Sequence, residues 1–120
     1  MPDEDSGQAL LAYCLAKPGA WQDEPWEGDV VAKVGPQGRG KIFAFLGDGT
    51  GVGLKCGSRD EADELVARYP DDVRPSAYIG RHGWNSVRLG GAVPYDEVLE
   101  LVDASYDEIV AKLPRAQRPA

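Results

Sequence analysis

The sequence predicts an α+β fold in which helices pack on one face of a single antiparallel sheet, in the order α-β-β-β-α-β-β-α. Three observations lead to this prediction. The length of 120 residues is that of one ordinary domain. Apolar residues recur at helical spacing in three segments of the chain, and glycine-rich turns separate the short β-branched and aromatic runs that lie between these segments.

The start of the chain predicts one helix. Apolar side chains at residues 10–15 follow helical spacing, Ser6 before them is a suitable N-cap, and Pro18 with Gly19 ends the run. The next stretch, residues 20–29, carries tryptophan and proline without a regular alternation. We therefore expect a loop there.

The middle of the chain predicts an antiparallel meander, because turn-rich sequences separate three strand-like runs. Ser58 and Glu61 then form the sequence pattern of a capping box, which opens a helix that stops before Pro70. The three strand-like runs cover residues 30–34, 41–46 and 51–56.

Two further strands and a long helix are expected after Pro70. Residues 73–79 predict an interrupted strand and residues 84–89 a continuous one. Residues 94–113 carry a long apolar stripe at helical spacing, which must pack against the sheet.

The whole chain is expected to form one domain at residues 6–114, with flexible tails at residues 1–5 and 115–120. Its apolar runs are far shorter than the ~20 residues of a membrane-spanning helix. The acidic N-terminus lacks the basic and apolar regions of a signal peptide. We expect a soluble, cytoplasmic monomer.

No group of residues predicts catalysis. His82 is the sole histidine, and Ser86 lies across a predicted strand start from it, which is not the arrangement of a catalytic triad. Cys14 and Cys56 are expected to be reduced core residues, because they lie in apolar patterns without the pair spacing of a disulfide framework or a zinc site. The sequence therefore predicts a non-enzymatic protein without a cofactor.

Charge is segregated along the chain. The net charge is −7, yet residues 30–59 contain five basic residues and one acidic residue, and residues 73–93 contain three basic residues and no acidic ones. Both segments belong to the predicted sheet region. If the helices cover one face, the sheet presents a basic front and the helices an acidic back.

Strand alternation predicts which side chains lie on the face that the helices leave free. It places Trp84, Ser86 and Arg88 there, with the lysines of neighbouring strands. Phe43 and Phe45 join them if the even-numbered residues of their strand face the core. Basic and aromatic side chains on one sheet face can pair with phosphates and stack on bases. The predicted nucleic-acid-binding residues are Lys33, Lys41, Lys55, Arg81, Trp84 and Arg88.

A series of short blocks carries a family resemblance. The blocks are Lys41-Ile42-Phe43-Ala44, Gly53-Leu54-Lys55-Cys56, His82-Gly83-Trp84-Asn85-Ser86-Val87, and Ser105-Tyr106 followed by Lys112-Leu113-Pro114. In this order, from residue 9 to residue 114, the chain resembles the MmcQ/YjbR-like proteins. The resemblance implies a frataxin-like CyaY fold, with helices flanking a twisted antiparallel sheet. It also implies the DNA-binding role commonly assigned to members by analogy with winged domains, and it transfers no catalytic residue.

Two other functions stand beside nucleic-acid binding. The surface around Trp84 could anchor a protein partner, which would make the chain an interaction or regulatory adaptor. The frataxin-like fold implied by the resemblance suggests a third function, the binding of iron or another hard cation on an acidic ridge. That ridge consists of Asp3, Glu4, Asp5, Asp23, Glu24, Glu27 and Asp29.

Overall fold

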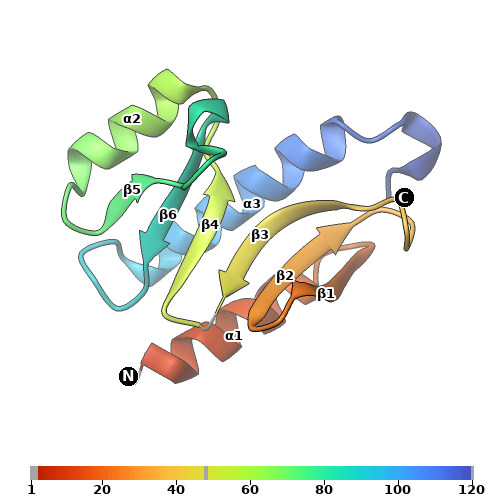
Figure 1. The fold of residues 1–120 in the computed structure, drawn as a ribbon, viewed down its shortest axis with the longest axis horizontal. Helices are drawn as coiled ribbons and strands as arrows, with labels where there is room; N and C mark the ends of the chain where they lie inside the picture. The colour runs from red at the N-terminus through yellow and green to blue at the C-terminus, as the bar shows by residue number, and fades with distance from the viewer. Residues whose placement is uncertain (1–2, 48, 120) are drawn as a thin grey trace.

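The computed structural model describes residues 3–47 and 49–119, with side chains placed from residue 6 onward. Within these residues, six strands form one open antiparallel sheet in the order β1-β2-β3-β4-β6-β5, and three α-helices pack against it (Figure 1). The predicted α+β class and single antiparallel sheet are confirmed. The strands are β1 (Ala20–Trp26), β2 (Asp29–Val34), β3 (Lys41–Gly47), β4 (Gly51–Lys55), β5 (Val73–Pro75) and β6 (Trp84–Arg88). The helices are α1 (Asp3–Leu15), α2 (Arg59–Arg68) and α3 (Tyr95–Ala111), with short 3₁₀ helices η1 (Gly80–His82) and η2 (Arg115–Gln117).

The three helices share one core with one face of the sheet. Leu10 of α1, Leu65 of α2 and Val102 of α3 belong to the same buried cluster as Val52 and Val87, which lie opposite each other in β4 and β6. Because side chains alternate along a strand, the neighbours of Val87 point to the other face, which none of the described helices covers. We call this the free face. In the described part of the chain, no helix is long and apolar enough to cross a membrane.

The prediction of a loop at residues 20–29 was wrong, because β1 lies there. This strand pairs with β2 from Ala20 to Trp26, and a bulge interrupts the register between Asp23 and Trp26. An edge strand tolerates proline and charged residues, so Pro25 and its polar neighbours concealed the strand from a search for alternation. The observed order is α-β-β-β-β-α-β-β-α, with one strand more than expected.

The first helix begins earlier than predicted. It starts at Asp3, so Ser6 lies inside the helix and is not its N-cap. Aspartate is as favourable as serine near a helix start, and residue type alone did not distinguish the two positions. The described residues of both predicted tails include regular structure, since residues 3–5 belong to α1 and Arg115–Gln117 form η2.

Phe43 points into the core and not to the free face, because a bulge interrupts β3 at this residue. The β2–β3 register skips this residue, which is therefore the extra residue of the bulge. Phe43 and Ala44 are both buried, and the Phe43 ring packs edge-on against Tyr106 of α3 with 5.2 Å between ring centroids. Phe43 thus belongs to the core, whereas Phe45 lies on the free face.

The predicted capping box at the start of α2 is confirmed. Ser58 Oγ accepts a hydrogen bond from the Glu61 backbone N–H at 3.2 Å, and Glu61 Oε1 accepts one from the Ser58 N–H at 2.9 Å. The hydrogen bonds to Ser58 hold the pKa of the Glu61 carboxyl below its ordinary value, because they favour its charged form. The helix ends before Pro70, as expected.

We expect Ser58→Ala to lower the free energy of unfolding by about 1 kcal/mol, because the Glu61 N–H loses its side-chain acceptor. Ser6→Ala is the matched control, since it removes a hydroxyl from inside α1 and should change stability by less than about 0.5 kcal/mol. Urea unfolding followed by circular dichroism measures both variants. Equal losses would contradict the cap assignment.

Candidate binding groove on the free face

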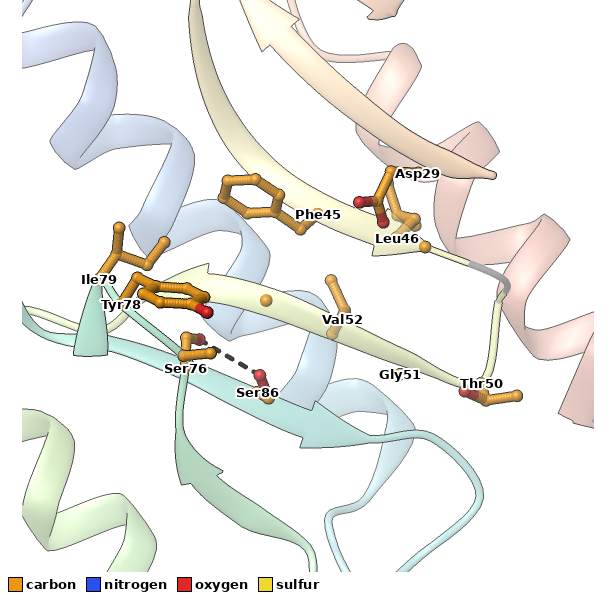
Figure 2. A pocket seen from close by; sticks show the side chains of 13 residues that line it. Asp29, Phe45, Leu46, Thr50, Gly51, Val52, Ser76, Tyr78, Ile79 and Ser86 are labelled. Atoms are coloured by element: carbon orange, nitrogen blue, oxygen red, sulfur yellow. Dashed lines mark hydrogen bonds between the residues drawn. The ribbon is translucent and has the colours of Figure 1, made fainter. Parts of the chain in front are cut away.

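A groove crosses the free face above β4 (Figure 2). Gly51 and Gly53 of β4 form its floor, Phe45 of β3 lines one side, and Tyr78 and Ile79 from the loop after β5 line the other. The groove has a volume of about 490 Å³, which lies in the range of small-molecule sites.

Glycine in β4 gives the groove its floor. A Cβ atom at Gly53 would lie 3.3 Å from Phe45 Cβ, and a longer side chain would fill the space between the walls. A Cβ atom at Gly51 would lie 2.9 Å from the Val87 carbonyl oxygen, so glycine is needed for β4 and β6 to approach each other here. The groove therefore exposes backbone where other strands present side chains.

Tyr78 is the most unusual residue of the groove. Its side chain is 95% exposed, and its φ of 67° lies in the left-handed region that favours glycine. No other non-glycine residue among those described has a positive φ. Such a conformation costs on the order of 1–3 kcal/mol, and strain of this kind gathers at binding sites. An exposed ring gains little from packing, so Tyr78 has the features of a ligand contact.

The loop that presents Tyr78 is attached to the sheet. The Ser76 N–H donates to the Trp84 carbonyl oxygen at 3.0 Å, and the Gly80 N–H donates to the Ser76 carbonyl oxygen at 2.9 Å. The hydroxyl oxygens of Ser76 and Ser86 lie 3.2 Å apart (Figure 2). These contacts fix the position of the loop beside the groove.

Two arginines, Arg74 of β5 and Arg88 of β6, lie next to the groove. Arg74 is paired opposite Ser86, and Arg88 follows Ser86 by two residues, so both lie on the free face. A second hollow of about 420 Å³ lies between them and shares Gly51 and Ser86 with the groove. The guanidinium of Arg88 is 3.7 Å from the Asp72 carboxylate and 71% exposed. The groove thus continues from an aromatic end to an end where Arg74 and Arg88 lie beside Asp71 and Asp72.

Two residues of the predicted site lie at this surface. Arg88 lines the hollow just described. Trp84 is half-buried and packs edge-on against Phe45, with 5.4 Å between ring centroids. Trp84 therefore supports one wall of the groove.

Three other predicted residues are not gathered there. Lys33 forms an ion pair with Asp23 at 2.7 Å. Lys41 is exposed at the start of β3, at the other end of this strand from the groove. Arg81 is exposed in η1 and donates a hydrogen bond from Nε to His82 Nε2 at 3.2 Å. The predicted basic platform is therefore not continuous.

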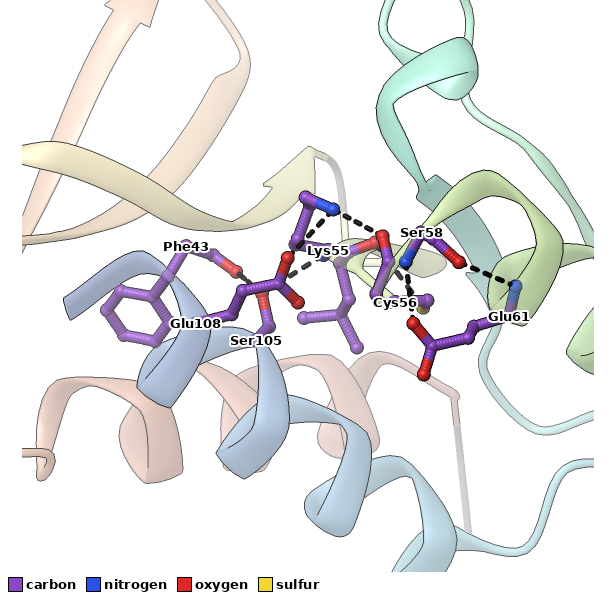
Figure 3. A network of polar contacts seen from close by, with 9 residues as sticks. Phe43, Lys55, Cys56, Ser58, Glu61, Ser105 and Glu108 are labelled. Carbon is purple, nitrogen blue, oxygen red and sulfur yellow. Dashed lines mark hydrogen bonds and ion pairs between the residues drawn. The ribbon is translucent and has the colours of Figure 1, made fainter. Parts of the chain in front are cut away.

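Lys55 was predicted to be exposed on the free face, and this was wrong. Its side chain is buried, and Nζ lies 2.8 Å from Glu108 Oε2 of α3 and also donates to the Gly57 carbonyl oxygen (Figure 3). A buried ammonium group needs such partners to offset its loss of hydration. The positive charge of Lys55 is thus neutralised inside the protein.

Ser105 of α3 lies between β3 and β4, next to Lys55. β3 and β4 pair at only two positions among the described residues and then diverge (Figure 1). In the opening, the Ser105 hydroxyl donates to the Phe43 carbonyl oxygen at 2.7 Å and accepts the Lys55 backbone N–H at 3.0 Å (Figure 3). Because α3 reaches the end of β4 here, Glu108 is within reach of the lysine.

Both cysteines are free thiols, as predicted. Burial raises the pKa of Cys14 to about 12 and that of Cys56 to about 11. At neutral pH both thiols are protonated, so neither has the character of a reactive nucleophile.

The predicted acidic ridge does not form a metal site within the described residues. No three His, Cys, Asp or Glu side chains converge there as metal ligands do. Asp23 is engaged by Lys33, and this contact, with the Glu24 N–H, lowers the pKa of the Asp23 carboxyl. The side chains of residues 3–5 lie outside the described part of the ridge.

Sequence reasoning missed Arg74 and Tyr78 as site residues. Alternation could have found Arg74, since it follows Val73 in a predicted strand and Val73 faces the core. No comparable signal exists for Tyr78, because tyrosine is common in cores and does not indicate a positive φ. Its place beside the groove, its exposed ring and its positive φ are visible only in the folded structure.

The fold and groove define a class of protein, a small α+β domain with a one-sided open sheet that presents a shallow aromatic groove. The chain belongs to the YjbR family, whose model matches residues 15–108. It is 36% identical over 114 residues to the Escherichia coli K12 protein named uncharacterized protein YjbR, and the match covers 91% of each chain. The protein of that name from Escherichia coli O157:H7 matches equally. The predicted family membership is confirmed.

Two solved structures share the fold. A Deinococcus radiodurans protein with a DUF419 domain superposes with a TM-score of 0.81 at 24% identity, covering 92% of this chain and 83% of that one. A Pseudomonas syringae protein superposes with a TM-score of 0.67 at 18% identity, covering 85% of this chain and 97% of that one. At these identities the similarity shows a common fold.

Ser105→Ala should lower the free energy of unfolding by about 2–3 kcal/mol, because the buried Phe43 carbonyl oxygen and Lys55 N–H both lose a partner. Ser86→Ala, at an exposed position of the free face, should stay within about 0.5 kcal/mol of the parent protein. Chemical denaturation of both variants tests whether the Ser105 hydroxyl bridges β3 and β4 through these two hydrogen bonds. A loss for Ser105→Ala no larger than that of the control would rule it out.

Tyr78→Gly should raise the free energy of unfolding by about 0.5–1 kcal/mol, because glycine adopts a positive φ without strain and the exposed ring buries little surface. Trp26→Gly is the control, since Trp26 is also exposed but ends a strand, and its replacement should destabilise. Thermal unfolding compares the two. A destabilised Tyr78→Gly variant would show that this backbone is not strained.

Proposed function

We propose that this protein is a non-enzymatic module that binds nucleic acid through the free face of its sheet. One observation carries the proposal: an aromatic groove adjoins two exposed arginines on a surface that the described helices leave open. Aromatic rings stack on bases, and arginine pairs with phosphate oxygens. The two kinds of contact lie next to each other here.

The site proposed from the structure differs from the one predicted from the sequence. Arg74, Phe45 and Tyr78 join Trp84 and Arg88. Lys33 and Lys55 leave the set, because their side chains are only 20% and 7% exposed and each is held by a carboxylate within 2.8 Å. Arg88 stays, because its contact with Asp72 is longer, at 3.7 Å, and 71% of its side chain is exposed. With a net charge of −7 and few free cations at the groove, binding should be weak and favoured by low salt.

A protein partner is the competing occupant of the same surface. Exposed or half-exposed aromatic residues such as Tyr78 and Trp84 are typical anchors of protein interfaces. The salt dependence of binding distinguishes the two functions. Binding through phosphate contacts weakens steeply as the salt concentration rises, whereas binding through an apolar anchor does not.

The family resemblance also supports a relationship to the frataxin-like CyaY fold, and we infer this relationship from the sheet with helices on one face. The absence of catalysis is likewise our inference, in keeping with two protonated thiols. The cytoplasmic location and the monomeric state expected from the sequence stay predictions.

Replacing both Arg74 and Arg88 by serine should weaken binding and flatten its salt dependence. For single strands each phosphate contact contributes about 0.7 to the slope of log K against log salt, so losing two contacts should flatten the slope by roughly 1.4. Fluorescence anisotropy with labelled single- and double-stranded DNA and RNA at several salt concentrations measures this.

The matched control replaces Arg39 and Arg115 by serine, which removes the same charge from exposed positions outside the groove. This control should retain most of the slope. An unchanged slope in the Arg74/Arg88 variant, or an equal change in the control, would count against a nucleic-acid site on this face.

A further inference from the structure

We propose that the ligand is a single-stranded nucleic acid, and that one unpaired base enters the groove between the rings of Phe45 and Tyr78 while the adjoining phosphate meets Arg74 and Arg88. The inference rests on the proposed function and names its substrate class. It follows from the shape of the groove, the state of its two rings and the distribution of charge along it.

The walls of the groove exclude a paired base. Phe45 comes from β3 and Tyr78 from the loop beside β6, so the two residues rise from opposite sides of β4 (Figure 2). A base inside a duplex has both faces stacked on its neighbours and cannot lay a face against either wall. A base of a single strand is free to do so, and this is how proteins usually read unpaired nucleic acid.

The Phe45 ring and the backbone of Tyr78 are held in place before any ligand arrives. Phe45 is supported edge-on by Trp84 at 5.4 Å between centroids. Tyr78 sits in a backbone conformation that few residues adopt, on a loop whose ends are hydrogen-bonded. A ring positioned in advance, as that of Phe45 is, loses little conformational entropy on binding, which favours stacking. The Tyr78 ring is 95% exposed, so it has no contacts to break before it meets a base. The strain at Tyr78 thus has a use in presenting its ring.

The polar groups of the groove suit the edge of a base without selecting one base. The hydroxyls of Ser76 and Ser86 lie beside each other on the groove lining. A hydroxyl both donates and accepts hydrogen bonds, so the pair can turn toward either kind of group on a base. This predicts broad base tolerance.

The charges of the groove lining indicate at which end the phosphate of the bound strand lies. Arg74 and Arg88 lie at the β5–β6 end of the surface together with Asp71 and Asp72, whereas at the other end Asp29, the first residue of β2, lines the groove without a basic neighbour in the lining. A phosphate is attracted to the arginines and repelled by the carboxylate. Asp72 keeps the Arg88 guanidinium close, and its own carboxylate is held by the Ala92 N–H at 2.8 Å. The phosphate should therefore sit at the arginine end.

The test compares labelled single-stranded oligonucleotides with blunt-ended duplexes of the same length, at low salt, by fluorescence anisotropy. We expect the single strand to bind at least about tenfold more tightly, and Tyr78→Ala to weaken single-strand binding by roughly 5- to 150-fold, the range for loss of one stacked base. Tyr78→Phe keeps the ring and should stay within about twofold of the parent. Trp26→Ala, at an exposed aromatic residue outside the groove, should have no effect.

The outcomes separate this inference from the proposed function. Equal affinity for duplex and single strand, or an unaffected Tyr78→Ala variant alongside a weakened Arg74/Arg88 variant, would overturn base insertion and leave nucleic-acid binding in place. If the parent protein binds no nucleic acid at low salt, both proposals fail and the protein-partner function takes precedence. Loss of binding in Tyr78→Ala with retention in Tyr78→Phe supports the insertion of a base.

Discussion

The hydroxyl group of Ser105 is the contact on which the arrangement of this protein depends. It stands between the Phe43 carbonyl oxygen and the Lys55 N–H, where two neighbouring strands would otherwise bond directly. Buried backbone groups must be paired, and Ser105 pairs both while keeping the strands apart. The separation lets α3 come close enough for Tyr106 to meet the Phe43 ring. A single side chain thereby couples the longest described helix to the middle of the sheet.

This coupling decides the electrostatics of the free face. The Lys55 side chain contacts Glu108 on α3 at 2.8 Å, so its charge is compensated within the protein. Lys33 is neutralised nearby by Asp23. The exposed basic side chains beside the groove are therefore Arg74 and Arg88, which share their hollow with Asp71 and Asp72. The surface has an aromatic end and an end that carries both arginines, which differs from the uniformly basic platform expected from the sequence.

Sequence reasoning succeeded where local signals are strong and failed where tertiary contacts override them. Helical spacing identified α3, and the Ser58 capping box identified α2. β1 was not predicted because a polar edge strand shows no alternation. The orientation of Phe43 was not predicted because a bulge shifts the alternation by one residue. The burial of Lys55 depends on Glu108, far away in the sequence, and the conformation of Tyr78 has no sequence signature. Trp84 and Arg88 were thus accessible from the pattern, whereas the place of Tyr78 and the burial of Lys55 required the assembled fold.

The two edges of the sheet determine how this protein can meet other chains. An open sheet offers unpaired N–H and C=O groups along its outer strands, and such edges recruit extended segments of other molecules. Here one edge strand contains Pro25 and a bulge, and the other, β5, is only three residues long. Both features interrupt the regular backbone pattern that strand addition needs. Growth into sheet-extended dimers or fibrils is therefore disfavoured.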